Sequence, residues 1–108
     1  MTTTCVVRHQ GAIDWMKMQS IPIDYWTESL DLDMVESGDT VIGILPMHMA
    51  AEVCAKGATF IALMIDLPRE YRGKELTVKQ LEEMSCCLMP FHVEARKNLP
   101  ILKNRTII

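Results

Sequence analysis

The chain has 108 residues and a formal net charge of −3; 49% of its residues are hydrophobic and 23% are charged. These values are those of one globular domain and exclude a long disordered segment. No apolar run approaches the roughly 18 to 20 residues of a membrane span. The first residues also lack the basic patch and apolar stretch of a signal peptide. We therefore expect a cytoplasmic protein that does not enter a membrane and whose four cysteines are reduced thiols.

The charges are distributed unevenly along the chain. Residues 1–54 hold two basic and eight acidic residues, whereas residues 55–108 hold nine basic and six acidic residues. No lysine or arginine occurs between residues 18 and 55. This distribution argues against general binding of duplex nucleic acid, and it means that an anionic ligand must bind at a local site.

Hydrophobic patterns in the first half of the chain predict alternating strands and helices. Residues 2–8 are rich in β-branched residues and predict a short strand, and residues 12–18 place apolar side chains at helical spacing. A second short strand is predicted at residues 23–26. Beyond the turn signal at residues 37–39, the apolar run at residues 40–45 is typical of a central parallel strand.

The second half continues this alternation. Pro46 ends the central strand, and residues 47–56 predict a helix that Gly57 terminates. Residues 58–67 predict a further strand and residues 69–75 a polar loop. A capping box, Thr77-x-x-Gln80, predicts a helix through about Cys87, and residues 91–95 alternate like an edge strand.

This order of elements predicts the α/β class. We expect residues 1–95 to form a small three-layer Rossmann-like domain with a mainly parallel central sheet. The basic C-terminal tail, residues 96–108, has two interpretations, a flexible segment and a part of a dimer interface.

In sheets of this class, ligands bind at the carboxyl ends of the strands, beside helix N-termini. These ends collect two of the three histidines and several basic residues, which suit phosphate binding and proton transfer. No carboxylate cluster, Walker loop or dinucleotide-binding glycine motif accompanies them. The favoured chemistry is therefore a reaction at a phosphodiester that needs no metal or cofactor. The candidate residues are Arg8, His9, Gln10 and Gly11, then Pro46, Met47 and His48, and finally Asp66, Arg69, Arg72, Gly73 and Lys74.

Structural interpretations compete with these functional ones. Arg8 alternatively forms a salt bridge at the sheet end, His9 caps the first helix, and residues 72–74 form a solvated loop. His48 alternatively is a neutral structural histidine; in the functional interpretation Glu52, one helical turn later, orients it. Asp66 is better suited to anchoring a loop or orienting a histidine than to binding metal. His92, on the last predicted strand, is interpreted as structural.

Three long segments, residues 6–15, 38–58 and 66–76, resemble the CRISPR-associated family called Csx-sixteen. The likeness extends to about Val93 and excludes the tail. The chain departs from the family pattern at several positions: Val7 stands where threonine is common, and Gln10 where proline is common. Met47 and Met49 replace valine and leucine, and Ala62 replaces a histidine. Arg8, His9 and His48 fit the pattern.

The resemblance implies a function similar to that of ring nucleases, which accompany type III CRISPR systems and degrade cyclic oligoadenylate, chiefly cyclic tetra-adenylate. Such enzymes use the 2′-hydroxyl of the ligand as nucleophile and leave a 2′,3′-cyclic phosphate without a metal. On this basis His48, Arg8 and His9 are the expected catalytic residues, with His48 as proton donor and Arg8 as phosphate clamp. Two alternatives stay open: a sensor or sponge that binds cyclic oligoadenylate without cutting it, and a structural CRISPR accessory protein.

We also expect a homodimer, because a C₂ assembly suits a ligand with rotational symmetry.

Overall fold

Short runs of β-branched and apolar residues form the strands of one sheet. In the computed structural model, which describes residues 1–66, 69–71 and 73–96, the sheet has five strands in the order β2-β1-β3-β4-β5. Strands β1 to β4 run parallel, and β5 runs antiparallel to β4 at the edge. The strands are β1 (Thr3–Val6), β2 (Tyr25–Thr27), β3 (Thr40–Gly43), β4 (Thr59–Met64) and β5 (Cys87–Phe91).

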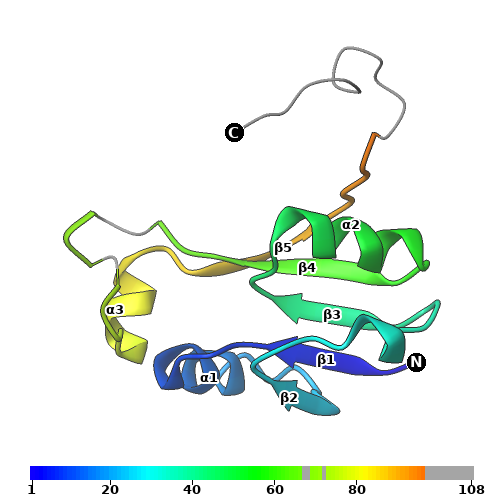
Figure 1. Cartoon of the computed structure of the whole chain (residues 1–108). Coiled ribbons are helices and arrows are strands. Elements are labelled where there is room, and N and C mark those ends of the chain that lie inside the picture. Colours follow the sequence, from blue (N-terminus) through cyan, green and yellow to red (C-terminus); the bar gives the residue numbers. More distant parts are fainter. Residues whose placement is uncertain (67–68, 72, 97–108) are drawn as a thin grey trace.

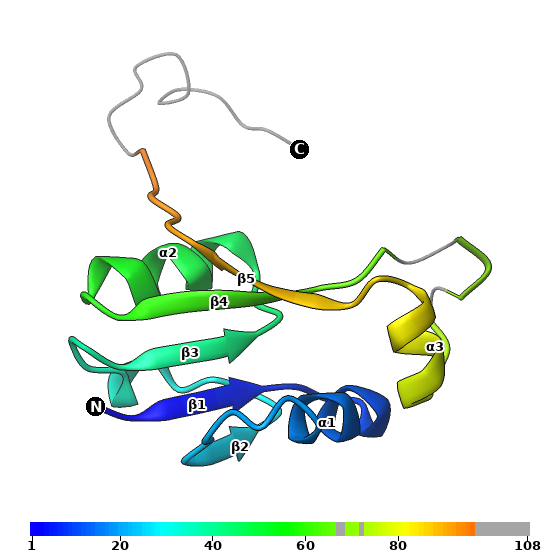
Figure 2. The same cartoon turned by 180° about the vertical axis from the view of Figure 1, so that it is seen from behind.

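Helices cover both faces of the sheet, because the strands carry apolar side chains on both sides. On one face, α1 (Gln10–Lys17) and α3 (Val78–Glu83) enclose a core with Cys5 and Ile42. On the other face, α2 (Met47–Ala55) and the 3₁₀ helix η1 (Leu32–Met34) enclose a core with Val6 and Val41. Figure 1 shows α1 and α3 close together and α2 well apart from them, and Figure 2 shows the same arrangement from behind. The predicted three-layer Rossmann-like fold with a mainly parallel sheet is confirmed.

The predicted elements of the first half are confirmed with small shifts of their ends. Strand β1 is shorter than predicted, and β3 ends at Gly43, two residues before the predicted end. The backbone of Gly43 has φ +145°, and a Cβ atom there would overlap the Val6 carbonyl oxygen. Only glycine therefore allows β3 to end so close to β1.

The end of the domain differs from the prediction. The capping box is confirmed, since the Thr77 hydroxyl accepts from the Gln80 N–H at 3.2 Å and the Gln80 side chain accepts from the Thr77 N–H at 3.0 Å. However, α3 ends at Glu83 rather than about Cys87, and Ser85 adopts a left-handed turn with φ 55°.

The last strand also lies earlier than predicted, at Cys87–Phe91 instead of residues 91–95. Its register pairs Cys87 with Met64 and Phe91 with Phe60. Pairing with the free edge of β4 and packing of Leu88 on the α1 side outweigh the local pattern at residues 91–95. Residues 92–96 form no strand, and His92 is exposed just beyond β5.

None of the helices in the described residues has the length and hydrophobicity needed to cross a membrane. Arg96 is exposed. The rest of the predicted basic tail, residues 97–108, lies outside the described residues.

Candidate functional site

The chain changes sides of the sheet between two neighbouring strands. β1 and β3 pair in parallel, yet β1 continues into α1 on one face and β3 continues into α2 on the other. In doubly wound sheets, such a switch point opens a crevice at the carboxyl ends of the strands, which is where ligands bind.

A cavity of about 460 Å³ lies at this switch point. Its volume falls within the range of roughly 300 to 1,000 Å³ that is common for small-molecule sites. Its walls are mostly apolar, with polar groups from Arg8, His9, Glu28 and Ser29. Among the residues that the structure describes, the lining consists of Val6, Val7, Arg8, His9, Ala12, Glu28, Ser29, Leu30, Ile44, Leu45, Pro46 and Met49. Hereafter it is called the switch-point cavity.

Arg8 supplies the arginine of the switch-point cavity. It is exposed, and its Nε donates a hydrogen bond to the Glu28 carbonyl oxygen at 3.2 Å. This bond ties the end of β1 to the segment after β2 and leaves the other guanidinium N–H groups available for a ligand. Within the described residues Arg8 makes no salt bridge, so the salt-bridge interpretation has no support there.

His9 occupies the N-cap position of α1, but its side chain makes no capping hydrogen bond. Its Nδ1 instead lies 2.7 Å from Glu75 Oε1, with the two side chains 63% and 68% exposed. The alternative interpretation, in which the His9 side chain caps α1, is therefore wrong. The contact joins the start of α1 to the segment before α3.

His48 lies in the first turn of α2, which begins after Pro46 as predicted. Pro46 and Met49 line the switch-point cavity, whereas His48 and Met47 do not. Both of these side chains are exposed. Among the described residues no hydrogen bond or salt bridge joins His48 to Glu52, so nothing supports the orienting role predicted for that carboxylate.

Gln10 and Gly11 belong to α1 itself. The Gln10 side chain donates to Asp14 Oδ1 at 2.8 Å along the helix. Gly11 is buried, and a Cβ atom there would overlap the Leu76 carbonyl oxygen. Position 11 is therefore glycine for a structural reason, because α1 approaches the segment before α3 too closely for a side chain.

The candidates that follow β4 lie elsewhere. Asp66, Arg69, Gly73 and Lys74 are exposed, and none of them lines the switch-point cavity. Asp66 follows β4 closely, and its backbone N–H donates to the Met84 carbonyl oxygen at 3.0 Å. This bond is made by the backbone, so the predicted role of the Asp66 side chain stays a prediction. Arg72 lies outside the described residues.

Sequence reasoning missed the segment after β2. Glu28, Ser29 and Leu30 line the switch-point cavity because β2 lies next to β1 in the sheet. The strand order brings them there, and the strand prediction for residues 23–26 is weak because Pro22 and polar residues interrupt the pattern. The only available signal was their position directly after a predicted strand.

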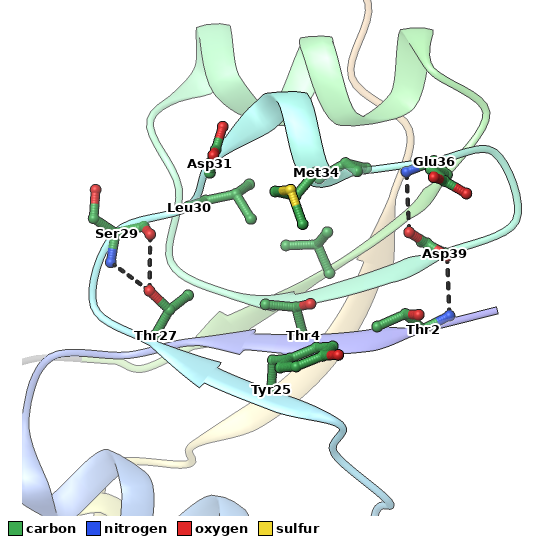
Figure 3. A pocket seen from close by; sticks show the side chains of 12 residues that line it. Thr2, Thr4, Tyr25, Thr27, Ser29, Leu30, Asp31, Met34, Glu36 and Asp39 are labelled. Carbon is green, nitrogen blue, oxygen red and sulfur yellow. Dashed lines mark hydrogen bonds between the residues drawn. The ribbon is translucent and has the colours of Figure 1, made fainter.

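A second cavity, of about 390 Å³, lies on the α2 face over β2, β1 and β3. Figure 3 shows its floor of Thr4, Tyr25 and Thr27, with Met34 of η1 above. At one end, Asp39 accepts hydrogen bonds from the N–H groups of Thr2 and Glu36, at 2.9 and 3.0 Å. These two bonds lower the pKa of the Asp39 carboxyl below its usual value. This second cavity is called the threonine groove below.

Thiol chemistry does not contribute to either cavity. None of the four cysteines forms a disulfide, and burial raises the pKa of Cys5 to about 11. Burial, together with the neighbouring Cys87, also raises the pKa of Cys86 to about 11. Cys5 and Cys86 are therefore protonated at neutral pH and lack the thiolate that a nucleophile requires. Within the described residues, no three His, Cys, Asp or Glu side chains are grouped to hold a metal ion.

The fold and the switch-point cavity define a doubly wound α/β domain with a ligand-sized, mostly apolar site that contains Arg8. The chain belongs to a CRISPR-associated family: the family model described as "Putative CRISPR-associated protein (Cas_VVA1548)" matches residues 4–94. This match runs from β1 to the residues that follow β5. No curated protein and no solved structure matches the chain.

Proposed function

We propose that this protein is a ring nuclease of the Csx-sixteen type, which linearises cyclic oligoadenylate and so switches off type III CRISPR signalling. The proposal rests on one observation: this chain of a CRISPR-associated family has a switch-point cavity whose lining is mostly apolar and includes Arg8. Apolar walls suit an adenine base, and a guanidinium suits a phosphodiester. Cyclic tetra-adenylate is the proposed principal substrate.

The proposed reaction needs no nucleophile from the protein. The ribose 2′-oxygen attacks the adjacent phosphorus, the bond from phosphorus to the 5′-oxygen breaks, and the 2′-hydroxyl proton passes to solvent. Arg8 stabilises the charge on the phosphate, and the imidazolium of His48 protonates the leaving 5′-oxygen. The products are a 2′,3′-cyclic phosphate and a 5′-hydroxyl. Binding in the cavity holds the ribose in line for this attack.

A second candidate function is favoured by the position of His48. Because this histidine lies outside the lining of the switch-point cavity, a ligand can occupy the cavity without reaching it. A protein of that kind would bind cyclic oligoadenylate as a sensor or sponge and leave it intact.

The decisive experiment mixes the protein with labelled cyclic tetra-adenylate in excess EDTA. We expect linear products with 2′,3′-cyclic phosphate ends, because Arg8 rather than a metal ion supplies the positive charge. Retention of intact ligand supports the sensor or sponge. Absence of both binding and cleavage supports a structural accessory role. Turnover that stops in EDTA and returns with magnesium or manganese would overturn the metal-independent mechanism.

Removal of the Arg8 guanidinium tests the phosphate clamp. We expect Arg8→Ala to weaken binding of cyclic tetra-adenylate about 10- to 100-fold, the worth of one or two charge-assisted hydrogen bonds. Because the contact exists in the ground state, binding and turnover should fall together. Lys17→Ala is the matched control, since its ammonium group lies over the Trp26 ring, 5.7 Å from the ring centroid, and not in the cavity. Equal losses in the two variants would point to a general charge effect and contradict the clamp.

We further propose a homodimer as the active unit. One cavity of about 460 Å³ accommodates a part of a four-nucleotide ring, and a C₂ interface would present the same cavity twice. Light scattering coupled to size exclusion should give twice the mass of the chain at assay concentration. A monomer with full activity would contradict this proposal.

A further inference from the structure

The threonine groove and the switch-point cavity are neighbours with a common wall. Ser29 and Leu30 line both of them. The wall is held in place at Thr27, whose hydroxyl donates to the Ser29 carbonyl oxygen at 2.8 Å and accepts from the Ser29 N–H at 3.2 Å. A ligand that leaves the switch-point cavity across this wall enters the groove directly.

The groove exists because the connection from β2 to β3 carries no α-helix. In a doubly wound fold this connection normally carries a helix that covers the sheet. Here residues 28–39 contain only the three-residue η1, so part of the β1 and β2 surface stays uncovered. The strands place side chains there that a helix would not bury well: Thr4 and Thr27 with hydroxyl groups, and Tyr25, which is 65% exposed.

The chemistry of the groove suits a neutral base and disfavours a phosphate. Asp31, Glu36 and Asp39 belong to its lining, and no lysine or arginine occurs between residues 18 and 55. Carboxylates and hydroxyls accept hydrogen bonds from the amino group of a base, and an exposed aromatic ring offers a surface for stacking. Arg8 stands on the other side of the common wall, so a phosphate is attracted to that side.

We infer that the threonine groove is a second base subsite, which binds the amino-bearing purine of the nucleotide next to the one whose phosphate contacts Arg8. The inference rests on the proposed function. In this arrangement the ribose-phosphate linkage crosses the wall at Ser29 and Leu30, and the Tyr25 ring stacks on the second base. Each chain then engages two adjacent nucleotides of the ring.

The test uses two probes of equal charge. One is diadenosine monophosphate with 2′-O-methyl groups, which block attack on the phosphodiester, and the other is the same molecule without the second base. We expect the native protein to bind the complete dinucleotide about 5- to 100-fold more tightly by calorimetry, the usual worth of stacking one base on an aromatic side chain. Tyr25→Ala should remove this difference and leave the affinity for the abasic probe unchanged. Tyr71→Ala, a tyrosine change in the 3₁₀ helix η2 (Arg69–Tyr71), should preserve it.

The outcomes separate the two proposals. If the native protein binds the abasic probe but gains nothing from the second base, the second subsite is wrong while the proposed function stands. Loss of affinity for both probes in Tyr25→Ala would also overturn the inference, because Tyr25 would then act on the whole fold or on the first subsite. If neither probe nor cyclic tetra-adenylate binds, the proposed function fails together with the inference.

Discussion

Replacement of His48 by alanine is expected to slow cleavage of bound cyclic tetra-adenylate by roughly 10² to 10⁴-fold, the range for loss of a general acid. The side chain is exposed at the start of α2 and makes no hydrogen bond or salt bridge with any described residue. Its removal should therefore leave folding intact and change the dissociation constant little. Single-turnover rates at saturating protein, measured in EDTA, isolate the chemical step from binding.

His92→Ala is the matched control for this experiment, because His92 is likewise exposed but follows β5, away from the switch point. It should keep the native rate. His9→Ala is informative in the opposite direction, since His9 lines the switch-point cavity. A native rate in His48→Ala with abolished cleavage in His9→Ala would show that His9 donates the proton.

The His9 variant also loses the contact with Glu75, so its effect on catalysis has to be separated from its effect on the fold. Glu75→Ala breaks the same 2.7 Å contact and keeps the imidazole. If His9 is the proton donor, Glu75→Ala should retain much more activity than His9→Ala. If His9 supports activity only through its contact with Glu75, the two variants should lose activity to the same degree.

The largest effect on stability is expected at Gly43. Alanine there combines a strained backbone at φ +145° with a steric overlap on the Val6 carbonyl oxygen, in the buried contact between β3 and β1. Strain and overpacking each cost about 1 to 3 kcal/mol, so Gly43→Ala should lower the free energy of unfolding by about 2 to 6 kcal/mol. Urea unfolding followed by the fluorescence of the buried Trp15 measures this loss.

Gly38→Ala provides the control, because Gly38 also has a positive φ, of +91°, but a Cβ atom there would make only an ordinary contact with Met1. Its cost should be that of the backbone alone, about 1 to 2 kcal/mol. Equal losses at Gly38 and Gly43 would show that the close approach of β3 to β1 relaxes without much cost. In that case the backbone at the ends of β3 and β1 adapts to a Cβ atom more easily than its geometry indicates.

Several features of this protein could be predicted from the sequence because they depend on neighbouring residues. The apolar run at residues 40–43, the proline that follows β3 and the Thr77 to Gln80 capping box each specify local backbone geometry through contacts a few residues apart. The alternation of strands and helices then restricts the fold to a doubly wound sheet. The positions of Arg8 and Pro46 at the carboxyl ends of their strands, and hence at the switch point, follow from that restriction.

Other features were decided by contacts between distant segments. The end of α3 and the place of β5 follow from pairing with the free edge of β4, which no pattern in residues 84–95 reveals. The strand order places Ser29 and Leu30 beside Arg8 and forms the wall between the two cavities, whereas Arg69 and Lys74, which follow β4, do not line the switch-point cavity. Local patterns specify which residues end a strand. Which strand ends meet depends on burial and backbone pairing across the whole sheet, and these energies exist only once the chain is folded.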